Sequence, residues 1–152
     1  VAGQWGLIPW FAKEPKLKYP TNNARSEELA DKASYKHPWA RGQRCIIPAW
    51  SFDEPCWETG RNVWWRFARA DGQPWGLAGL WSRWTDPQTG ELIDSYTMLT
   101  LNADAHPSVV VREPEAWAPW LQATVPVASS LVGLAPVEVF EARPLHSGPS
   151  LF

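Results

Sequence analysis

Residues 75–84 read WGLAGLWSRW and residues 95–103 read SYTMLTLNA, with the turn residues DPQTG at positions 86–90 between them. Both stretches are rich in the aromatic and β-branched residues that favour strands. Gly, Pro and Asp between such stretches mark the end of one strand and the start of the next. The two stretches therefore predict two β-strands joined by a turn.

The same β signal continues on both sides of this pair. Residues 44–52 and 63–68 have the same character, and Asp71-Gly72 predicts a hairpin between residues 63–68 and the strand that follows. Shorter strands are expected at residues 108–112 and 137–142. The pattern predicts an α+β fold with an antiparallel-rich sheet.

Helices are predicted beside the sheet. Ser26 reads as an N-cap and predicts a helix over residues 26–36, because Pro38 disfavours helical geometry at the residue before it. Pro114 suits the first turn of a second helix. The side chains expected to share a face of that helix are Trp117, Trp120 and Leu121.

Length and composition fit one domain with a real core. The chain has 152 residues, of which 45% are hydrophobic and 20% charged, and this mix excludes a coiled coil, disorder and collagen-like repeats. The longest apolar runs are about six residues, too short to cross a membrane, and no signal-peptide pattern is present. Cys45 and Cys56 have neither zinc nor disulfide spacing, which favours a reducing cytoplasm.

Charge is distributed unevenly along the chain. The net charge is −2, but residues 1–50 hold eight Lys and Arg against four acids, a net of +4, and residues 51–152 hold a net of −6. This argues against a general DNA-coating protein and fits a local anion site. Lysines that simply solvate a loop would give the same charge count.

Several kinds of chemistry are excluded by the absence of their motifs. The sequence has no phosphate-binding glycine loop, no metalloprotease helix and no nucleophile-elbow serine. The three histidines, His37, His106 and His146, are scattered. We therefore predict no metal site and no cofactor.

Four motifs stand out instead, in a fixed order along the chain. They are WGLIPW at 5–10, NNAR at 22–25, RCIIPA at 44–49 leading into SFDE at 51–54, and GLAGLW at 76–81 leading to a strand with Thr97, Thr100 and Asn102.

The ordered set resembles the SOS-response-associated peptidase (SRAP) family, whose patterns include W-G-[LI]-[IV]-P-x-W, N-A-R-x-E, R-C-[LI]-x-P, A-G-L-W and T-x-x-A-N. The resemblance covers roughly Trp5 to Leu121, and the order is more specific than any single motif. It implies one SRAP-like domain over residues 1–152, with a barrel-like β core and flanking helices. It also implies that the native N-terminal segment is not among these residues.

The resemblance implies a sensor of abasic sites in single-stranded DNA that acts in the DNA damage (SOS) response. In the family, the α-amine of an N-terminal Cys condenses with the ring-opened sugar aldehyde, and its thiol closes a thiazolidine. Such a Cys offers two nucleophiles on adjacent carbons, and an α-amine titrates near neutrality. That Cys is not among the 152 residues, and the word peptidase refers to a proposed self-processing that exposes it.

Site residues follow from the resemblance position by position. Asn23 matches the amide that holds the Cys and the crosslink, and Glu54 matches the acid–base carboxylate that assists sugar opening. Arg25 matches a phosphate-contacting arginine, and Trp10 with Phe11 occupies the place of an aromatic wedge against bases. Taken alone, each would be read as structural: a turn amide, a strand-end acid or a paired arginine.

The sequence also departs from the family pattern. Trp50-Ser51 stands where the family has Asp-Gly, and Pro55 follows Glu54 in place of a Trp, so the local shape around the carboxylate is expected to differ. Cys45 matches a structural strand cysteine and Cys56 matches nothing, so neither is the nucleophile.

The family's catalytic histidine lies in a loop after the T-x-x-A-N strand. Here His106-Pro107 runs straight into Ser108. We expect a missing loop after Pro107, with a Cα–Cα distance between residues 107 and 108 well above the 3.8 Å of a peptide bond. His106 would then be a leading, non-catalytic histidine; the alternative is that His106 is itself catalytic.

Two other functions remain open on the sequence: a non-covalent, aromatic-rich module for single strands or carbohydrate, and a thiol peptidase acting only on its own terminus. The expected partner is single-stranded DNA with abasic sites, and no membrane partner is expected. We expect Asn23 and Glu54 to face one cleft, within about 12 Å of each other. Arg25 with some of the lysines at 13, 16 and 18 would flank that cleft.

Overall fold

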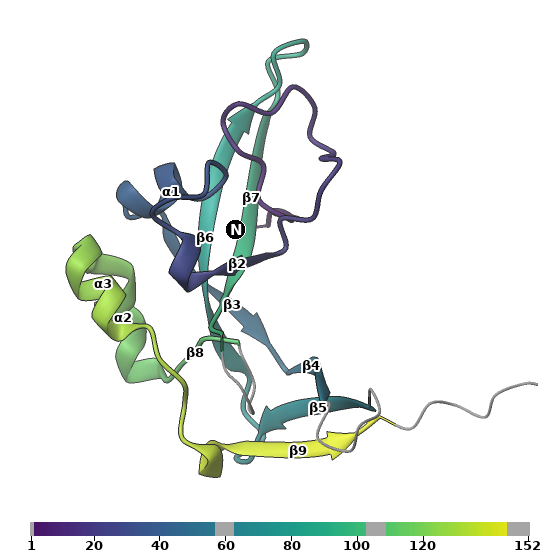
Figure 1. Ribbon diagram of the computed structural model, residues 1–152, viewed down its shortest axis with the longest axis vertical. Helices are drawn as coiled ribbons and strands as arrows, with labels where there is room; N and C mark the ends of the chain where they lie inside the picture. The colour runs from purple at the N-terminus through teal and green to yellow at the C-terminus, as the bar shows by residue number, and fades with distance from the viewer. Residues whose placement is uncertain (1, 57–62, 103–108, 146–152) are drawn as a thin grey trace, which may run out of the picture.

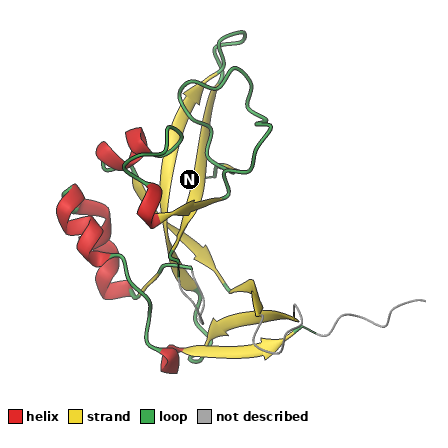
Figure 2. Cartoon of the chain, in the orientation of Figure 1, coloured by secondary structure: helices red, strands yellow, loops and turns green. Residues whose placement is uncertain are grey.

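The computed structural model describes residues 2–56, 63–102 and 109–145. Within these ranges the chain forms two β-sheets and three α-helices (Figure 1, Figure 2). The larger sheet contains β1 (Gln4–Trp5), β2 (Asn23–Arg25), β3 (Arg44–Ala49), β6 (Trp75–Thr85), β7 (Leu92–Thr100) and β8 (Val111–Arg112). The smaller sheet contains β4 (Ser51–Cys56), β5 (Val63–Arg69) and β9 (Phe140–Pro144). The helices are α1 (Lys36–Ala40), α2 (Pro114–Gln122) and α3 (Val125–Leu131).

The long β6–β7 hairpin is the centre of the larger sheet. Its antiparallel register runs from Gly79 opposite Met98 to Thr85 opposite Leu92. Gly90 has a φ of 74° in the connecting turn, a left-handed conformation that glycine adopts without a Cβ clash. β1 and β2 pair in parallel with β7, and β3 pairs antiparallel with β6.

One face of the larger sheet is covered by the helices. Ser95, Thr97 and Leu99 alternate along β7 and are buried on this face. The core between sheet and helices is made by Leu7, Ala24, Leu29, Tyr35, Trp39, Ala78, Leu80, Leu99, Val110, Trp120 and Ala128. Burial of each large apolar side chain contributes about 1.5–3 kcal/mol, so this core fixes the helices to the sheet.

The opposite face, which we call the open face, carries Tyr96, Met98 and Thr100 of β7. The smaller sheet packs against the lower end of this face as drawn in Figure 1. The core between the two sheets is made by Phe52, Trp75, Leu77, Val109 and Val111. Above that contact no helix or strand within the described ranges packs on the open face, and Trp81 on β6 is 38% exposed.

A buried arginine attaches α2 to the sheet. Arg44 at the start of β3 is 5% exposed, and its Nε donates to the carbonyl of Trp120 at 2.7 Å. A second guanidinium nitrogen donates to the carbonyl of Ala123. The guanidinium also lies 5.9 and 5.6 Å from the ring centroids of Trp39 and Trp120. Cationic donors at the carbonyl end of a helix stabilise it, so Arg44 joins α2 to β3 and α1.

The predicted α+β class with an antiparallel-rich sheet is confirmed, while the barrel-like description is too specific. Over the described ranges the two sheets pack on each other without closing into a barrel. The chain leaves the larger sheet at Trp50, so the single strand predicted at 44–52 is two strands in different sheets. Asp71-Gly72 does form a turn, with a Gly72 φ of 74°. The predicted hairpin there is wrong, because β5 and β6 pair with other strands.

The helix predicted at 26–36 is also wrong. Ser26–Glu28 forms one 3-10 turn without a side-chain cap, and the helix begins at Lys36, where the prediction ended it. Pro38 lies in the first turn of α1, where its missing N–H has no intrahelical partner to lose. The helix predicted from Pro114 is confirmed as α2, although Leu121 is exposed rather than buried with Trp120.

Other expectations fall outside the described residues or are not tested there. His106 and the peptide between Pro107 and Ser108 lie outside the described ranges. Among the described helices, none combines the length and apolar character required to cross a membrane.

Candidate functional site

Strand β2 presents two of the predicted site residues on the open face. Asn23 pairs with Met98 and Arg25 with Thr100 in a parallel ladder. The residue between them, Ala24, is fully buried against the helices. Side chains alternate along a strand, so Asn23 and Arg25 point to the other face, where both are exposed.

The carboxylate of Glu54 reaches the end of the same sheet from β4. Glu54 lies two residues after the buried Phe52, so both side chains face the larger sheet. Its Oε1 accepts the backbone N–H of Val109 at 3.2 Å. Val109 in turn bridges Thr100, the ladder partner of Arg25. Two strand spacings, about 10 Å, therefore separate the backbones of Arg25 and Val109.

The surroundings of Glu54 differ from those of Asp53, the acid beside it on β4. Asp53 faces the other side of β4 and accepts two hydrogen bonds from Arg66, at 2.8 and 2.9 Å. That guanidinium lowers the pKa of Asp53. On the side of Glu54, the cross-strand neighbour is Trp65. Trp65 was not predicted as a site residue, because only the β4–β5 register places it beside the carboxylate.

A second carboxylate, Glu27, holds the end of β7. Its Oε1 accepts the N–H of Asn102 at 2.7 Å, and this backbone hydrogen bond is the main cause of its lowered pKa. Asn102 and Val109 are the residues immediately before and after 103–108. Glu27 and Glu54 therefore fix the chain on both sides of that segment. No contact between Glu27 and Asn102 was predicted from the sequence, where Glu27 is the acidic residue of the N-A-R-x-E pattern.

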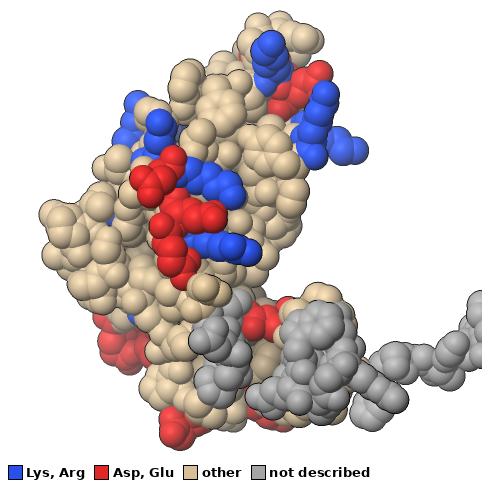
Figure 3. Space-filling model, in the orientation of Figure 1, with Lys and Arg blue, Asp and Glu red and all other residues tan. Residues whose placement is uncertain are grey.

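A polar pocket lies in the loop between β1 and β2. It has a volume of about 300 Å³ and is lined by Gln4, Trp5, Gly6 and residues 15–22, which include Lys16 and Lys18. Lys13 does not line it. On the face shown in Figure 3, the basic side chains lie in the upper half with acidic ones among them, and the lower part shows mainly acidic side chains. Lys32, for example, pairs with Glu28 at 3.1 Å.

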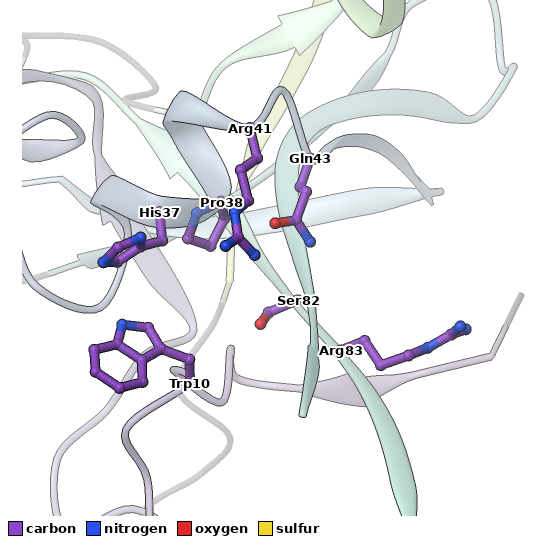
Figure 4. A pocket seen from close by; sticks show the side chains of 7 residues that line it. All are labelled: Trp10, His37, Pro38, Arg41, Gln43, Ser82 and Arg83. Atoms are coloured by element: carbon purple, nitrogen blue, oxygen red, sulfur yellow. The ribbon is translucent and has the colours of Figure 1, made fainter. Parts of the chain in front are cut away.

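Trp10 and Phe11 are exposed, as expected for a wedge, with 66% and 41% of their surface accessible. Trp10 packs edge-on against Phe11 and His37, with both centroid distances 5.7 Å. It borders a pocket of about 360 Å³ shared with α1 and β6 (Figure 4). Because α1 covers the helix side of the sheet, the structure places these two aromatics away from the face that presents Asn23 and Arg25.

Other reactive groups in the described ranges have structural surroundings. Burial raises the pKa of the Cys45 thiol to about 12, and a buried thiol that stays protonated is a poor nucleophile. No cluster of three or more His, Cys, Asp or Glu side chains suited to a metal ion occurs among the residues that the structure describes.

Comparison with known proteins identifies the family. The model of the SOS response associated peptidase (SRAP) family matches residues 1–147. The chain belongs to the SRAP family. The resemblance inferred from the ordered motifs is therefore confirmed.

Curated relatives of this SRAP chain have a common name. The chain is 30% identical over 177 residues to the "Abasic site processing protein HMCES" of Xenopus tropicalis, and the match covers 96% of this chain and 52% of that protein. It is 37% identical over 101 residues to the "Abasic site processing protein YobE" of Bacillus subtilis, covering 64% of this chain and 44% of that protein. The chain thus spans about half the length of the curated relatives it matches.

Solved structures share the SRAP fold. A crystal structure of a protein from Bordetella bronchiseptica has a TM-score of 0.83 at 39% identity, over 94% of this chain and 75% of that one. A protein from Bacteroides thetaiotaomicron has a TM-score of 0.79 at 22% identity, over 94% of this chain and 68% of that one. The two solved structures therefore share the fold of this chain.

Proposed function

We propose that this SRAP chain processes abasic sites in single-stranded DNA by forming a covalent crosslink through an N-terminal Cys outside the 152 residues. The observation that carries the proposal is the position of Glu54. Its half-buried carboxylate is held on the Val109 amide at the end of β7. The neighbouring strand β2 presents Asn23 and Arg25 on the same face. The relatives' shared name supports abasic-site DNA as the substrate class.

The proposed reaction begins with opening of the abasic sugar. The hemiacetal hydroxyl loses its proton, the bond between C1′ and the ring oxygen breaks, and the ring oxygen takes up a proton, giving the aldehyde. A carboxylate can accept the first proton and return it to the ring oxygen. We assign this transfer to Glu54.

Crosslinking then follows from the chemistry of an N-terminal Cys. The α-amine adds to the aldehyde carbon, and loss of one water gives an imine. The thiol sulfur adds to the imine carbon and its proton passes to the nitrogen, which closes the thiazolidine. Asn23 would hold the α-amine and the ring nitrogen by amide hydrogen bonds. Arg25 would contact the phosphate next to the lesion.

The test uses the full-length protein with its gene-encoded N-terminus. It is incubated with a single-stranded oligonucleotide carrying one abasic site, and the products are separated on a denaturing gel. We expect a shifted band that is absent with undamaged DNA and absent when the N-terminal Cys is replaced by Ala. Reversible, salt-sensitive retention without a denaturant-stable band would identify a non-covalent binding module and overturn the covalent mechanism.

A further inference from the structure

Three aromatic residues form a row across the open face. Trp5 of β1 is the register partner of Tyr96 on β7, and Tyr96 is opposite Trp81 on β6. Register partners point to the same face of a sheet. The rings of Trp5 and Tyr96 are 5.2 Å apart at an interplanar angle of 62°.

The row remains accessible although two of its members, Tyr96 and Trp81, lie on the central strands β7 and β6 of the larger sheet. Trp5 is 43% and Trp81 is 38% exposed. On the helix side of the same strands, Ser82 and Ser95 are 7% and 1% exposed. Neighbouring large aromatic side chains left exposed at a protein surface commonly mark a binding site.

The row lies next to the candidate site. Met98, the register partner of Asn23, follows Tyr96 by two residues on β7. It therefore points to the same face, about 7 Å along the strand. The aromatic row and the Asn23–Arg25 strand are consecutive parts of one surface.

Positive charge is available at one end of the row. Trp5 also lines the pocket that contains Lys16 and Lys18. Arg83 and Asp94 form a cross-strand pair two residues along β6 and β7 from Trp81 and Tyr96, on the side away from Met98. Hydrogen bonds of 2.7 and 2.8 Å join their side chains. The two lysines, rather than the paired Arg83, are therefore the cations of this surface that are available to contact phosphate.

We propose that Trp5, Tyr96 and Trp81 form a stacking platform for unpaired bases of the damaged strand beside the lesion, with Lys16 and Lys18 along its phosphates. This inference rests on the proposed function, because the platform would hold the DNA strand that leads to the same site. A sheet face that presents aromatic rings binds bases of any sequence, since every base has a π-face. An abasic-site sensor must accept lesions in any sequence, and this surface has that property.

The experiment measures binding and crosslinking separately on the full-length protein. Fluorescence anisotropy with an undamaged single-stranded oligonucleotide gives the affinity, and a denaturing gel at saturating abasic-site DNA gives the crosslink. We expect Trp5→Ala and Trp81→Ala each to weaken single-strand binding about tenfold, as for loss of one stacked base. Trp81→Phe, which keeps a ring, should retain most of the affinity. Trp64→Ala removes a 48% exposed indole from β5, where Trp64 alternates with Trp65 and so points away from the larger sheet, and it is the matched control.

A second measurement connects the platform to individual bases. Tetrahydrofuran spacers, which lack a base, are placed one at a time in the oligonucleotide beside a fixed abasic site. We expect at least one position where the spacer weakens binding by the wild type but not by Trp81→Ala, because both changes remove the same contact. If no position behaves in this way, the platform is wrong.

The outcomes separate the two proposals. Platform variants that bind like the wild type while crosslinking continues would overturn the platform and leave the proposed function standing. Weakened binding by these variants in a protein that forms no crosslink would support the platform and overturn the covalent function. Variants that lower the melting temperature without lowering affinity would show that another part of the full-length protein covers the row, and would also overturn the platform.

Discussion

At the scale of single residues, two adjacent acids on β4 have opposite environments. Asp53 is engaged by Arg66, whereas Glu54 faces the end of the larger sheet. Glu54→Gln keeps the shape and an acceptor oxygen but cannot exchange a proton in the same way. We expect the crosslinking rate, measured by quenched time points on a denaturing gel, to fall by about 100-fold or more.

The matched control for this change is Asp53→Asn. It removes an exposed ion pair that contributes less than about 1 kcal/mol, and it should leave the crosslinking rate unchanged. Equal loss of rate in both variants would mean that the strand, rather than the Glu54 carboxylate, is the important feature.

Glu27 makes a prediction about pH. The Asn102 N–H lowers its pKa in the folded protein, so the stabilisation is fully present above the unfolded pKa, about 4.3. It is lost as the pH falls through the lower, folded value. Urea unfolding of the wild type and Glu27→Gln should therefore show a stability difference at pH 7 that shrinks below pH 4. A difference that stays constant with pH would contradict this role.

The site residues differ in how far the sequence could predict them. Asn23, Arg25 and Glu54 were predicted because they belong to motifs in a fixed order, and their roles remain predictions. The contact of Glu27 with Asn102 joins residues 75 apart, and only the paired strands bring them together. The aromatic row has the same origin, since Trp5 and Tyr96 meet only through the β1–β7 register.

At the scale of elements, β6 depends on a glycine. A Cβ built on Gly79 would lie 2.7 Å from the Thr97 carbonyl oxygen, 2.7 Å from Ile47 Cδ1 and 2.9 Å from Cys45 Sγ. One of these atoms is backbone and cannot rotate away. We expect Gly79→Ala to lower the free energy of unfolding by about 1–3 kcal/mol in urea titrations.

Gly133→Ala serves as the control, because nothing lies within 4 Å of its added Cβ. A surface change of this kind should stay within about 0.5 kcal/mol of the wild type. If Gly79→Ala were equally neutral, the close approach of β3, β6 and β7 would not be a constraint on the fold.

The elements also show where sequence patterns stop being informative. Composition identified the strands, and Pro114 identified the start of α2. The division of residues 44–56 between two sheets was not predictable, because the strand signal continues through Trp50 and only the choice of partner differs. The prediction of a helix at 26–36 was wrong for a related reason. The Glu27 carboxylate accepts a hydrogen bond from the Asn102 amide instead of stabilising a helix end.

At the scale of the whole molecule, the net charge of −2 means that the proposed DNA binding depends on where cations are placed. Arg25 is exposed on the open face, whereas Lys32 is paired with Glu28. We expect Arg25→Ala to weaken single-strand binding and to reduce the salt slope of log K by about 0.7, the value for one phosphate contact. Anisotropy titrations at several salt concentrations measure both.

Lys32→Ala removes the same charge from the molecule at a place with no assigned DNA contact. It should leave the salt slope as it is in the wild type. Identical slopes for the wild type and Arg25→Ala would remove Arg25 from the phosphate contacts.

The arrangement of strands around β7 also determines when the site can form. Hydrogen bonds that shape it join residues 55, 75 and 87 positions apart, between Glu54 and Val109, Glu27 and Asn102, and Ile8 and Ser95. Contacts of such long sequence separation are slow to form, because each closes a long loop. During synthesis, residues 1–90 include Asn23, Arg25 and Glu54 but not β7, the strand with which β2 pairs and which Val109 bridges. A nascent or truncated chain therefore cannot assemble the candidate site before β7 has been made and paired.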